Sequence, residues 1–421
     1  MEKRAIMQSI NPLLPEVGFA EEKLLPPRQA IVAFFSRVAL APPGTERVAL
    51  ESALGRVLAE AIVADGDYPA APRSVMDGFA IYAQAAPGEF NIVEDVQMGL
   101  APERSITEQT ATRIPTGGVL PAGANAVVPI ENVRVSKNVL LVEESVEVGD
   151  NVAERGADMR RDEIVLRPRR RIRANEIGVL ATMGVTAVPV YRRPVIAVLS
   201  SGDELVDPET RPRPGQIRDS NRYAMAASLR AMGAEPRHYP TLRDEAQEFE
   251  SGLARALSEC DAVVVTGGSS VGERDRLPPA VSKIAQPGVV VHGLRVKPGK
   301  PTLLGAHADK PIIGLPGNPT SALIMLEAVA APIVAALSGA PIGDWALHAR
   351  LAAPAKSRPG WTWYIPVALQ DDGGVPVAQP LPLRSFSVSL TARADGYIVM
   401  EEGDEEWPAG TPVIVHRFLG G

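Results

Sequence analysis

Three short apolar runs between residues 193 and 340 constrain the fold of this 421-residue chain more than any other feature. They are Pro194–Leu199 (PVIAVL), Ala262–Thr266 (AVVVT) and Pro311–Leu315 (PIIGL), and none of them alternates with polar residues. Continuous apolar runs of this length are typical of strands that are buried on both faces. Helical patterns separate the runs, and buried strands that alternate with helices predict a doubly wound α/β domain over residues 193–340.

Capping residues mark where the helices of this domain begin and end. Ser220 is the predicted N-cap of a helix that Gly233 ends, and Asp244 is the predicted cap of the next helix. Asn318 at a cap and Pro319 at the first helical position predict the start of a third, long helix.

The other segments predict small β domains and a linker. Short β-type runs cut by glycine and proline occupy residues 69–156, which predicts an inserted β domain. Residues 25–68 and 157–192 flank it, and a resemblance to a known family, given below, implies that they form one discontinuous, elongated helical linker domain. Residues 341–421 contain all the tryptophans and have no strong helical period, which predicts a separate C-terminal β domain.

Composition excludes several classes of function. Lys and Arg number 43 against 50 Asp and Glu, so the net charge of −7 gives no basic field to recruit nucleic acid or an anionic membrane. The single Cys260 excludes an intramolecular disulfide and a cysteine-cluster metal site, and no histidine pair has zinc-site spacing. With no expected membrane helix and no signal peptide, we expect a cytoplasmic protein.

Three polar loops follow the three predicted strands. They span residues 200–205, 266–275 and 314–321 and are rich in glycine and hydroxyl side chains. Because ligands of open α/β sheets bind beyond the carboxyl ends of the strands, these loops predict one shared pocket. Backbone N–H groups and a helix N-terminus at that edge favour a phosphate or another oxyanion. Neither the Walker A pattern nor G-x-G-x-x-G is present, which argues against conventional ATPase and NAD sites.

Charged residues accompany these loops. Glu204 and Asp275 fit a hard cation such as Mg²⁺ that bridges carboxylates and a phosphate. Lys297 and Lys300 lie in the stiff segment Lys-Pro-Gly-Lys-Pro, which presents two cations in advance of binding. Taken singly, each of these residues is also explained as a turn, a cap or a solvated surface residue.

In chain order, these motifs resemble those of the molybdopterin molybdenumtransferase family (MoeA and the E domain of gephyrin), from about Leu25 to Phe418. The resemblance rests on the following segments: Ser74-x-Met76-Asp77-Gly78-Phe79, Thr116-Gly117, Pro121-Ala122-Gly123, Arg155-Gly156-x-Asp158, Ser201-Gly202-Asp203-Glu204-Leu205, Gly215–Asn221, Gly267-Gly268-x-Ser270-Val271-Gly272-x-x-Asp275, Lys297–Pro301 and Gly314–Pro319.

The resemblance implies an activity and an assembly. The activity is insertion of molybdate into adenylyl-molybdopterin, with Mg²⁺-dependent release of AMP. The assembly is a homodimer through the linker domain, in which the α/β domain of one subunit faces the β domain of the other, and residues 341–421 form a β-barrel. An upstream molybdopterin adenylyltransferase and downstream molybdoenzymes are the implied partners.

The resemblance also implies roles for particular residues. Glu204 and Asp275 would hold the metal, and Lys297 and Lys300 would attract molybdate or the pterin phosphate. The implied catalytic residues are Asp77, Thr116, Asp158, Glu204, Asp244 and Asp275. The implied substrate-binding residues are Gly267, Gly268, Ser269, Ser270, Lys297, Lys300, Pro316, Gly317, Asn318 and Pro319.

The sequence departs from the family pattern at four places. Pro69-Ala70-Ala71-Pro72 replaces Pro-Pro-Phe-Asp, and Asn125 stands where aspartate is common. Trp361-Thr362-Trp363 replaces basic residues, and the glycine-serine loop reads Arg384-Ser385-Phe386-Ser387. These departures leave open a non-catalytic cofactor carrier or scaffold of the same fold. The sequence does not discriminate molybdate from tungstate.

Overall fold

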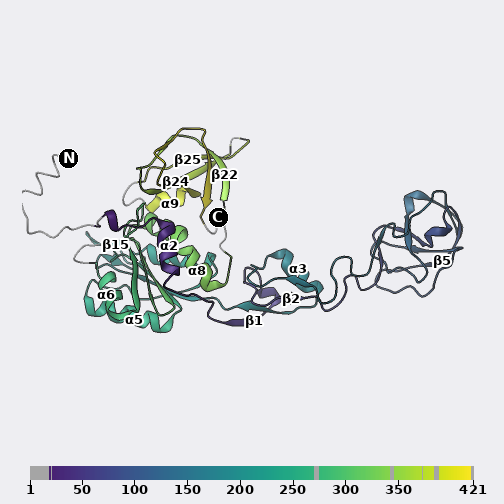
Figure 1. The fold of residues 1–421 in the computed structure, drawn as a ribbon, viewed down its shortest axis with the longest axis horizontal. Coiled ribbons are helices and arrows are strands. Elements are labelled where there is room, and N and C mark those ends of the chain that lie inside the picture. The colour runs from purple at the N-terminus through teal and green to yellow at the C-terminus, as the bar shows by residue number, and fades with distance from the viewer. Residues whose placement is uncertain are drawn as a thin grey trace, which may run out of the picture. The chain divides into compact units, whose positions relative to one another are not determined.

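The computed structural model describes residues 19, 21–269, 275–341, 346–371, 373–383 and 388–418. The chain divides into two compact units (Figure 1). The first comprises the residues up to Ala59, Arg169–Arg173 and the chain from Ala187 onward, and the second comprises Glu60–Pro168 and Ala174–Thr186.

A mixed six-stranded sheet is the centre of the first unit. Its strand order is β16-β13-β17-β21-β20-β18, in which the first four strands are parallel and β20 and β18 each run antiparallel to the preceding strand. The bounds are β13 Val195–Ser200, β16 Glu235–His238, β17 Ala262–Thr266, β18 Pro287–His292, β20 Leu303–His307 and β21 Lys310–Leu315. The predicted α/β class is confirmed, and the three apolar runs are β13, β17 and β21.

Both faces of this sheet are covered, which explains why its strands are apolar throughout. Alternate side chains of β13 enter two separate cores: Ile196 and Val198 pack on one face, and Ala197 and Leu199 on the other. In Figure 1, α2 and α8 lie on the opposite side of the sheet from α5 and α6. The helices are α2 Pro27–Phe35, α4 Asn221–Ala231, α5 Ala246–Glu259, α6 Leu277–Ile284, α7 Pro319–Met325 and α8 Ala331–Ser338.

The helix caps differ from the predicted ones at two positions. The Ser220 side chain makes no capping bond, and the Arg222 N–H instead donates to the Asp219 carboxylate at 3.0 Å. Helix α5 is capped by Glu245, whose carboxylate accepts bonds from two backbone N–H groups of the first turn. Asp244 is therefore free of capping and points elsewhere. The predicted Asn318 cap is confirmed, because its side chain accepts from the Ser321 N–H at 3.2 Å.

The helical segment from Pro319 to Ser338 corrects the expectation that no apolar run is long enough to span a membrane. It is 20 residues long with a mean hydropathy of 1.9 and continues from α7 through the π-helical turn η5 (Leu326–Ala330) into α8. However, 61% of its 18-residue apolar window is buried, and Ile324, Val329 and Ile333 pack in one core with the sheet. These contacts are those of a core helix.

The C-terminal strands of the first unit close into a ring. Each of the strands β24, β25, β22, β28 and β26 pairs with the next, and β26 pairs back with β24. Their inward side chains, such as Val367, Ile398 and Val415, form a separate core. The bounds are β22 Ala346–Leu351, β24 Thr362–Gln370, β25 Val377–Pro380, β26 Gly396–Met400 and β28 Pro412–Arg417. Strand β19 (Val296–Lys297) pairs in parallel with the first residues of β24.

The second unit contains another six-stranded sheet, in the order β7-β4-β6-β5-β9-β8. Its strands are β4 Gly78–Ile81, β5 Gly88–Asp95, β6 Thr110–Ile114, β7 Ala126–Pro129, β8 Val133–Ser136 and β9 Val139–Val142. The β-type runs that the sequence indicates in this domain are residues 79–82, 91–96, 126–129 and 139–142. Strand β6 is not among them, because the sequence TATRI has no bulky apolar run, although Ala111, Thr112 and Ile114 are buried. Asn125 has a local structural role here, since its side chain accepts from the Ala83 N–H at 2.7 Å.

The capping contacts predict unequal effects of two alanine substitutions. Glu245→Ala removes the acceptor for two N–H groups of α5 and is expected to cost about 1 kcal/mol of stability. Ser220→Ala is the matched control and is expected to change stability by less than about 0.5 kcal/mol, because its hydroxyl makes no capping bond. Urea unfolding, with hydrogen exchange of the Glu248 N–H as the local readout, tests this. Equal effects of the two substitutions would contradict the observed caps.

Candidate functional site

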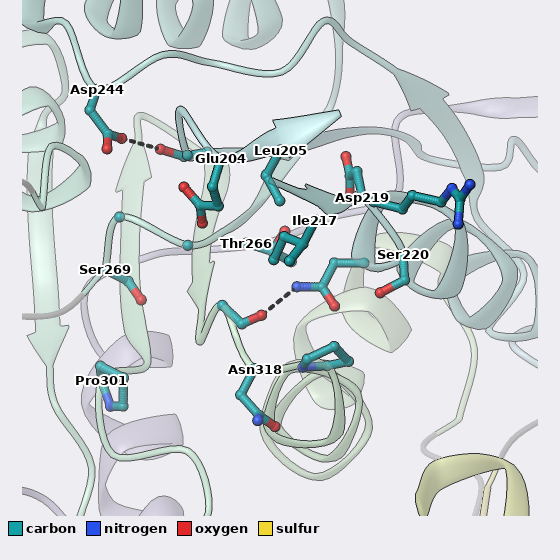
Figure 2. A pocket seen from close by; sticks show the side chains of 18 of the residues that line it. Glu204, Leu205, Ile217, Asp219, Ser220, Asp244, Thr266, Ser269, Pro301 and Asn318 are labelled. Carbon is teal, nitrogen blue, oxygen red and sulfur yellow. Dashed lines mark hydrogen bonds between the residues drawn. The ribbon is translucent and has the colours of Figure 1, made fainter. Parts of the chain in front are cut away.

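A cavity of about 860 Å³ lies beyond the carboxyl ends of β13, β17 and β21 (Figure 2). All three loops that the sequence singled out contribute to its wall. The predicted site residues in its lining are Glu204, Asp244, Gly267, Gly268, Ser269, Asp275, Gly317, Asn318 and Pro319. The structure thus brings Glu204 and Asp275, the two predicted metal ligands, to one cavity.

Glycines allow the first two loops to meet. Gly267 has a φ of +84°, and a Cβ there would lie 2.5 Å from the Ser201 carbonyl oxygen. Gly202 has a φ of +148°, and a Cβ there would lie 2.6 Å from a carboxylate oxygen of Glu204. The Ser201 N–H donates to the Thr266 carbonyl at 2.9 Å and holds the two loops together. The contact at Gly267 requires glycine, because it combines a positive φ with a backbone oxygen, whereas the Glu204 carboxylate opposite Gly202 belongs to a flexible side chain.

Asp244 is fixed from three sides. Its carboxylate accepts a hydrogen bond from the Ser201 hydroxyl at 3.3 Å, which Figure 2 draws as a dashed line. Its N–H donates to the Asp203 carboxylate at 3.4 Å, and its carbonyl accepts from Arg276 Nε at 2.9 Å. The loop that carries Asp244 is therefore tied both to the loop after β13 and to the start of α6.

The acidic lining fits a hard cation that is shared with a ligand. No group of three or more His, Cys, Asp or Glu side chains able to hold a metal occurs within the described ranges. Mg²⁺ commonly uses one or two carboxylates together with substrate phosphates and waters, so it does not need such a group. Glu204 and Asp275 supply oxygen donors of that kind in the lining of the same cavity.

Ser269 and Gly267 hold the loops rather than offering free donors to a ligand. The Ser269 hydroxyl donates to the Leu315 carbonyl at 3.1 Å, and the Gly267 N–H donates to the same oxygen at 3.1 Å. Ser269 is only 2% exposed, and its own carbonyl lies 2.9 Å from Nε2 of His292. A phosphate contact by this hydroxyl would have to replace the bond to Leu315. Ser270 lies outside the described residues.

Asn221 and Asp219 are among the lining residues that were not predicted as site residues. Asn221 donates from Nδ2 to the Gly317 carbonyl at 2.8 Å, which ties the loop after β21 to the start of α4. Asp219 is 2% exposed and also lines the cavity. Both belong to the segment Gly215–Asn221. The sequence signal that could have identified them is Asp219, an acidic residue directly before Ser220, which was predicted as the cap of this helix.

A second cavity of about 540 Å³ shares Pro301 and Asn318 with the first. Lys297 and Lys300 line this second cavity, together with Arg358, Trp361 and Trp363. The predicted lysines are therefore next to the acidic cavity and not inside it. Pro316 is buried and lines neither of these two cavities. Residues 384–387 lie outside the described ranges.

The remaining predicted residues belong to the second unit. Asp77 and Thr116 are in contact, because the Asp77 carboxylate accepts from the Thr116 N–H at 2.6 Å and from its hydroxyl at 2.9 Å. These two bonds, and then the charge of Arg113, hold the pKa of the Asp77 carboxyl below its ordinary value. Asp158 is exposed, and its N–H donates to the Tyr68 carbonyl.

Taken together, the sheet, the three loops and the acidic cavity define an α/β domain with a ligand pocket at its strand ends, combined with β domains. Comparison with known proteins agrees with this class. Residues 25–184 match the MoeA N-terminal region (domain I and II), residues 197–336 match the "probable molybdopterin binding domain", and residues 348–418 match the MoeA C-terminal region (domain IV).

Individual relatives extend over most of the chain. The molybdopterin molybdenumtransferase of Bacillus subtilis is 31% identical over 88% of this chain and 89% of its own length. That of Synechocystis is 31% identical over 87% of this chain and 93% of its own length. A crystal structure of the molybdopterin biosynthesis MoeA protein from Pyrococcus horikoshii has a TM-score of 0.83 at 26% identity, covering 94% of this chain and all of that one. The chain belongs to the MoeA family.

The close approach of the first two loops predicts that Gly267→Ala is severe. The added Cβ meets a backbone oxygen at 2.5 Å in addition to the strain of a positive φ, so we expect a loss of more than about 2 kcal/mol of stability. Gly215→Ala is the matched control, because Gly215 has a similar φ of +89° but open space around its Cβ position. Thermal unfolding measures both variants. A Gly267→Ala variant as stable as Gly215→Ala would show that the contact between the loops is not constraining.

The Asp77–Thr116 contact predicts a measurable titration shift. Because the native pKa of Asp77 is lowered, its contribution to stability is present at neutral pH and is lost as the pH falls through that lowered pKa. Thr116→Val removes the hydroxyl bond but keeps the N–H bond, so the pKa of Asp77 should rise part of the way to its ordinary value. Carboxyl ¹³C NMR titration tests this, with Thr116→Ser as the control that keeps both bonds. An unchanged Asp77 pKa in Thr116→Val would contradict the assigned contact.

Proposed function

We propose that this protein is a molybdopterin molybdenumtransferase that inserts molybdate into adenylyl-molybdopterin and releases AMP. Membership of the MoeA family and the curated names of its relatives support this assignment. The observation that carries it in this chain is the convergence of three strand-end loops on one cavity that also receives Glu204 and Asp275.

The acidic cavity is the proposed site for the adenylate end of the substrate. Glu204 and Asp275 hold Mg²⁺, which when bound neutralises charge on the phosphoanhydride. Asp244 orients the Ser201 loop through its bond to the Ser201 hydroxyl. Asn318 caps α7 and faces both cavities, so it lies where the two ends of the substrate meet.

The cationic second cavity is the proposed site for the oxyanion and the non-nucleotide end of the substrate. Lys297, Lys300 and Arg358 line it, and no carboxylate is present in its described lining. Positive charge at this position attracts a dianion such as molybdate. Roles for Asp77, Thr116 and Asp158, the homodimer and the upstream and downstream enzymes remain predictions from the family resemblance. The cytoplasmic location remains a prediction from the sequence.

The proposed reaction is tested by AMP release from adenylyl-molybdopterin. We expect release that requires both molybdate and Mg²⁺. Release of AMP without any dependence on molybdate, or none at all, would contradict the transferase and favour a carrier or scaffold. Running tungstate in parallel determines which oxyanion is preferred.

The metal ligands are tested by Asp275→Asn and Glu204→Gln. Each substitution replaces a carboxylate of the cavity with a neutral amide. We therefore expect at least about a tenfold higher Mg²⁺ requirement for AMP release, with lower turnover. Glu209→Gln is the matched control, because it removes the same charge from an exposed residue on a neighbouring loop outside the cavity lining. Unchanged turnover and Mg²⁺ requirement for Asp275→Asn would refute its role as a ligand.

A further inference from the structure

Trp363 and Lys297 are held together by the backbone although they are far apart in sequence. In the parallel pairing of β19 with β24, Lys297 is in register with Trp363. The Thr362 N–H also donates to the Arg295 carbonyl at 3.1 Å, beside this pair. Side chains in register on neighbouring strands project to the same face of the sheet. Lys297 Nζ accordingly lies 4.3 Å from the centroid of the Trp363 ring.

This contact orients the lysine without neutralising it. Within the part of the chain that the structure describes, Lys297 makes no ion pair, and the described lining of its cavity contains no carboxylate. The face of an indole ring attracts an ammonium group but carries no net charge. A carboxylate at position 363 would hold the same lysine and cancel its charge.

Packing of the barrel does not explain why position 363 is a tryptophan. The Trp363 Nε1–H is buried and has no acceptor among the described residues, which is a cost that phenylalanine or leucine would avoid. Trp407 offers a direct comparison, because it packs against the same barrel core. Its Nε1–H donates to Asp404 at 3.3 Å, and no cation lies over its ring in the described structure. The Trp363 indole thus lacks the N–H hydrogen bond that Trp407 makes, but it contacts the Lys297 ammonium.

We propose that Trp363 is a positioning residue of the substrate site, which holds the Lys297 ammonium in the wall of the second cavity so that its full charge is available to the oxyanion substrate. This inference rests on the proposed function for the identity of the anion. Trp363 acts through Lys297 and does not itself need to touch the reacting atoms. The indole thus replaces the acidic partner that would otherwise order such a lysine.

A double-mutant cycle tests the inference. The variants are Trp363→Leu, Lys297→Met and the combination of both, with Trp363→Phe as the conservative variant and Trp407→Leu as the packing control. Equilibrium dialysis with inorganic molybdate at low ionic strength gives the Kd of the full-length protein, and thermal unfolding checks the fold. The KM for molybdate and kcat for AMP release are measured on the same proteins.

We expect Trp363→Leu to weaken molybdate binding roughly fivefold and to raise KM with little change in kcat. Trp363→Phe should recover most of the affinity, because it keeps an aromatic face. In the Lys297→Met background, Trp363→Leu should have an effect of less than about twofold, because the group it positions is gone. Trp407→Leu should lower stability but leave Kd unchanged.

Three results would overturn the inference: no molybdate binding by the wild-type protein, wild-type affinity in Trp363→Leu, or an undiminished effect of Trp363→Leu in the Lys297→Met background. Its failure is distinguishable from failure of the proposed function. Coupled molybdate binding without AMP release would retain the role of Trp363 and remove the transferase. AMP release without coupling between Trp363 and Lys297 would retain the transferase and remove the role of Trp363.

Discussion

The close approach of two strand-end loops is the contact on which the acidic cavity depends. The loop after β17 passes so near the loop after β13 that a Cβ at Gly267 would lie 2.5 Å from the Ser201 carbonyl oxygen. The Ser201 hydroxyl in turn holds Asp244, and Gly202 leaves room for the Glu204 carboxylate. The Glu204 and Asp244 carboxylates therefore line one cavity whose first two loops are already in backbone contact. This arrangement is preorganised, so a ligand does not need to assemble it.

The strands of the α/β domain were predictable because their signal is local and strong. Strands covered on both faces must be apolar at every position, and β17 was predicted with its observed bounds, Ala262–Thr266. The same reasoning missed β6, because only part of TATRI is large and apolar, and its burial comes from neighbours that are distant in sequence. The apolar helix from Pro319 to Ser338 was underestimated because Pro332 interrupts its sequence, whereas the structure continues the helix through η5 into α8.

The site was predictable at the level of loops and less so at the level of atoms. Parallel strands bring their carboxyl ends to one edge, so Glu204 and Asp275 could be expected to meet. Which donor each side chain serves depends on the packed structure: Glu245, and not Asp244, caps α5, and this leaves Asp244 to bond Ser201. Asn221 was overlooked for the same reason, since its partner, the Gly317 carbonyl, is 96 residues away.

The opposite charges of the two cavities explain how one anionic substrate can occupy both. The first is lined by Glu204, Asp219, Asp244 and Asp275 against the single cation Arg218 in its described lining, so a phosphate enters it favourably only together with a counter-cation. The second is lined by three cations, of which Arg358 is paired with Glu21 at 3.4 Å, and its described lining has no carboxylate, so an oxyanion enters it directly. Because Pro301 and Asn318 line both cavities, the acidic cavity and the cationic cavity adjoin each other. Aromatic rings suit the second cavity, because they order lysines without adding negative charge. Carboxylates there would make the second cavity acidic like the first.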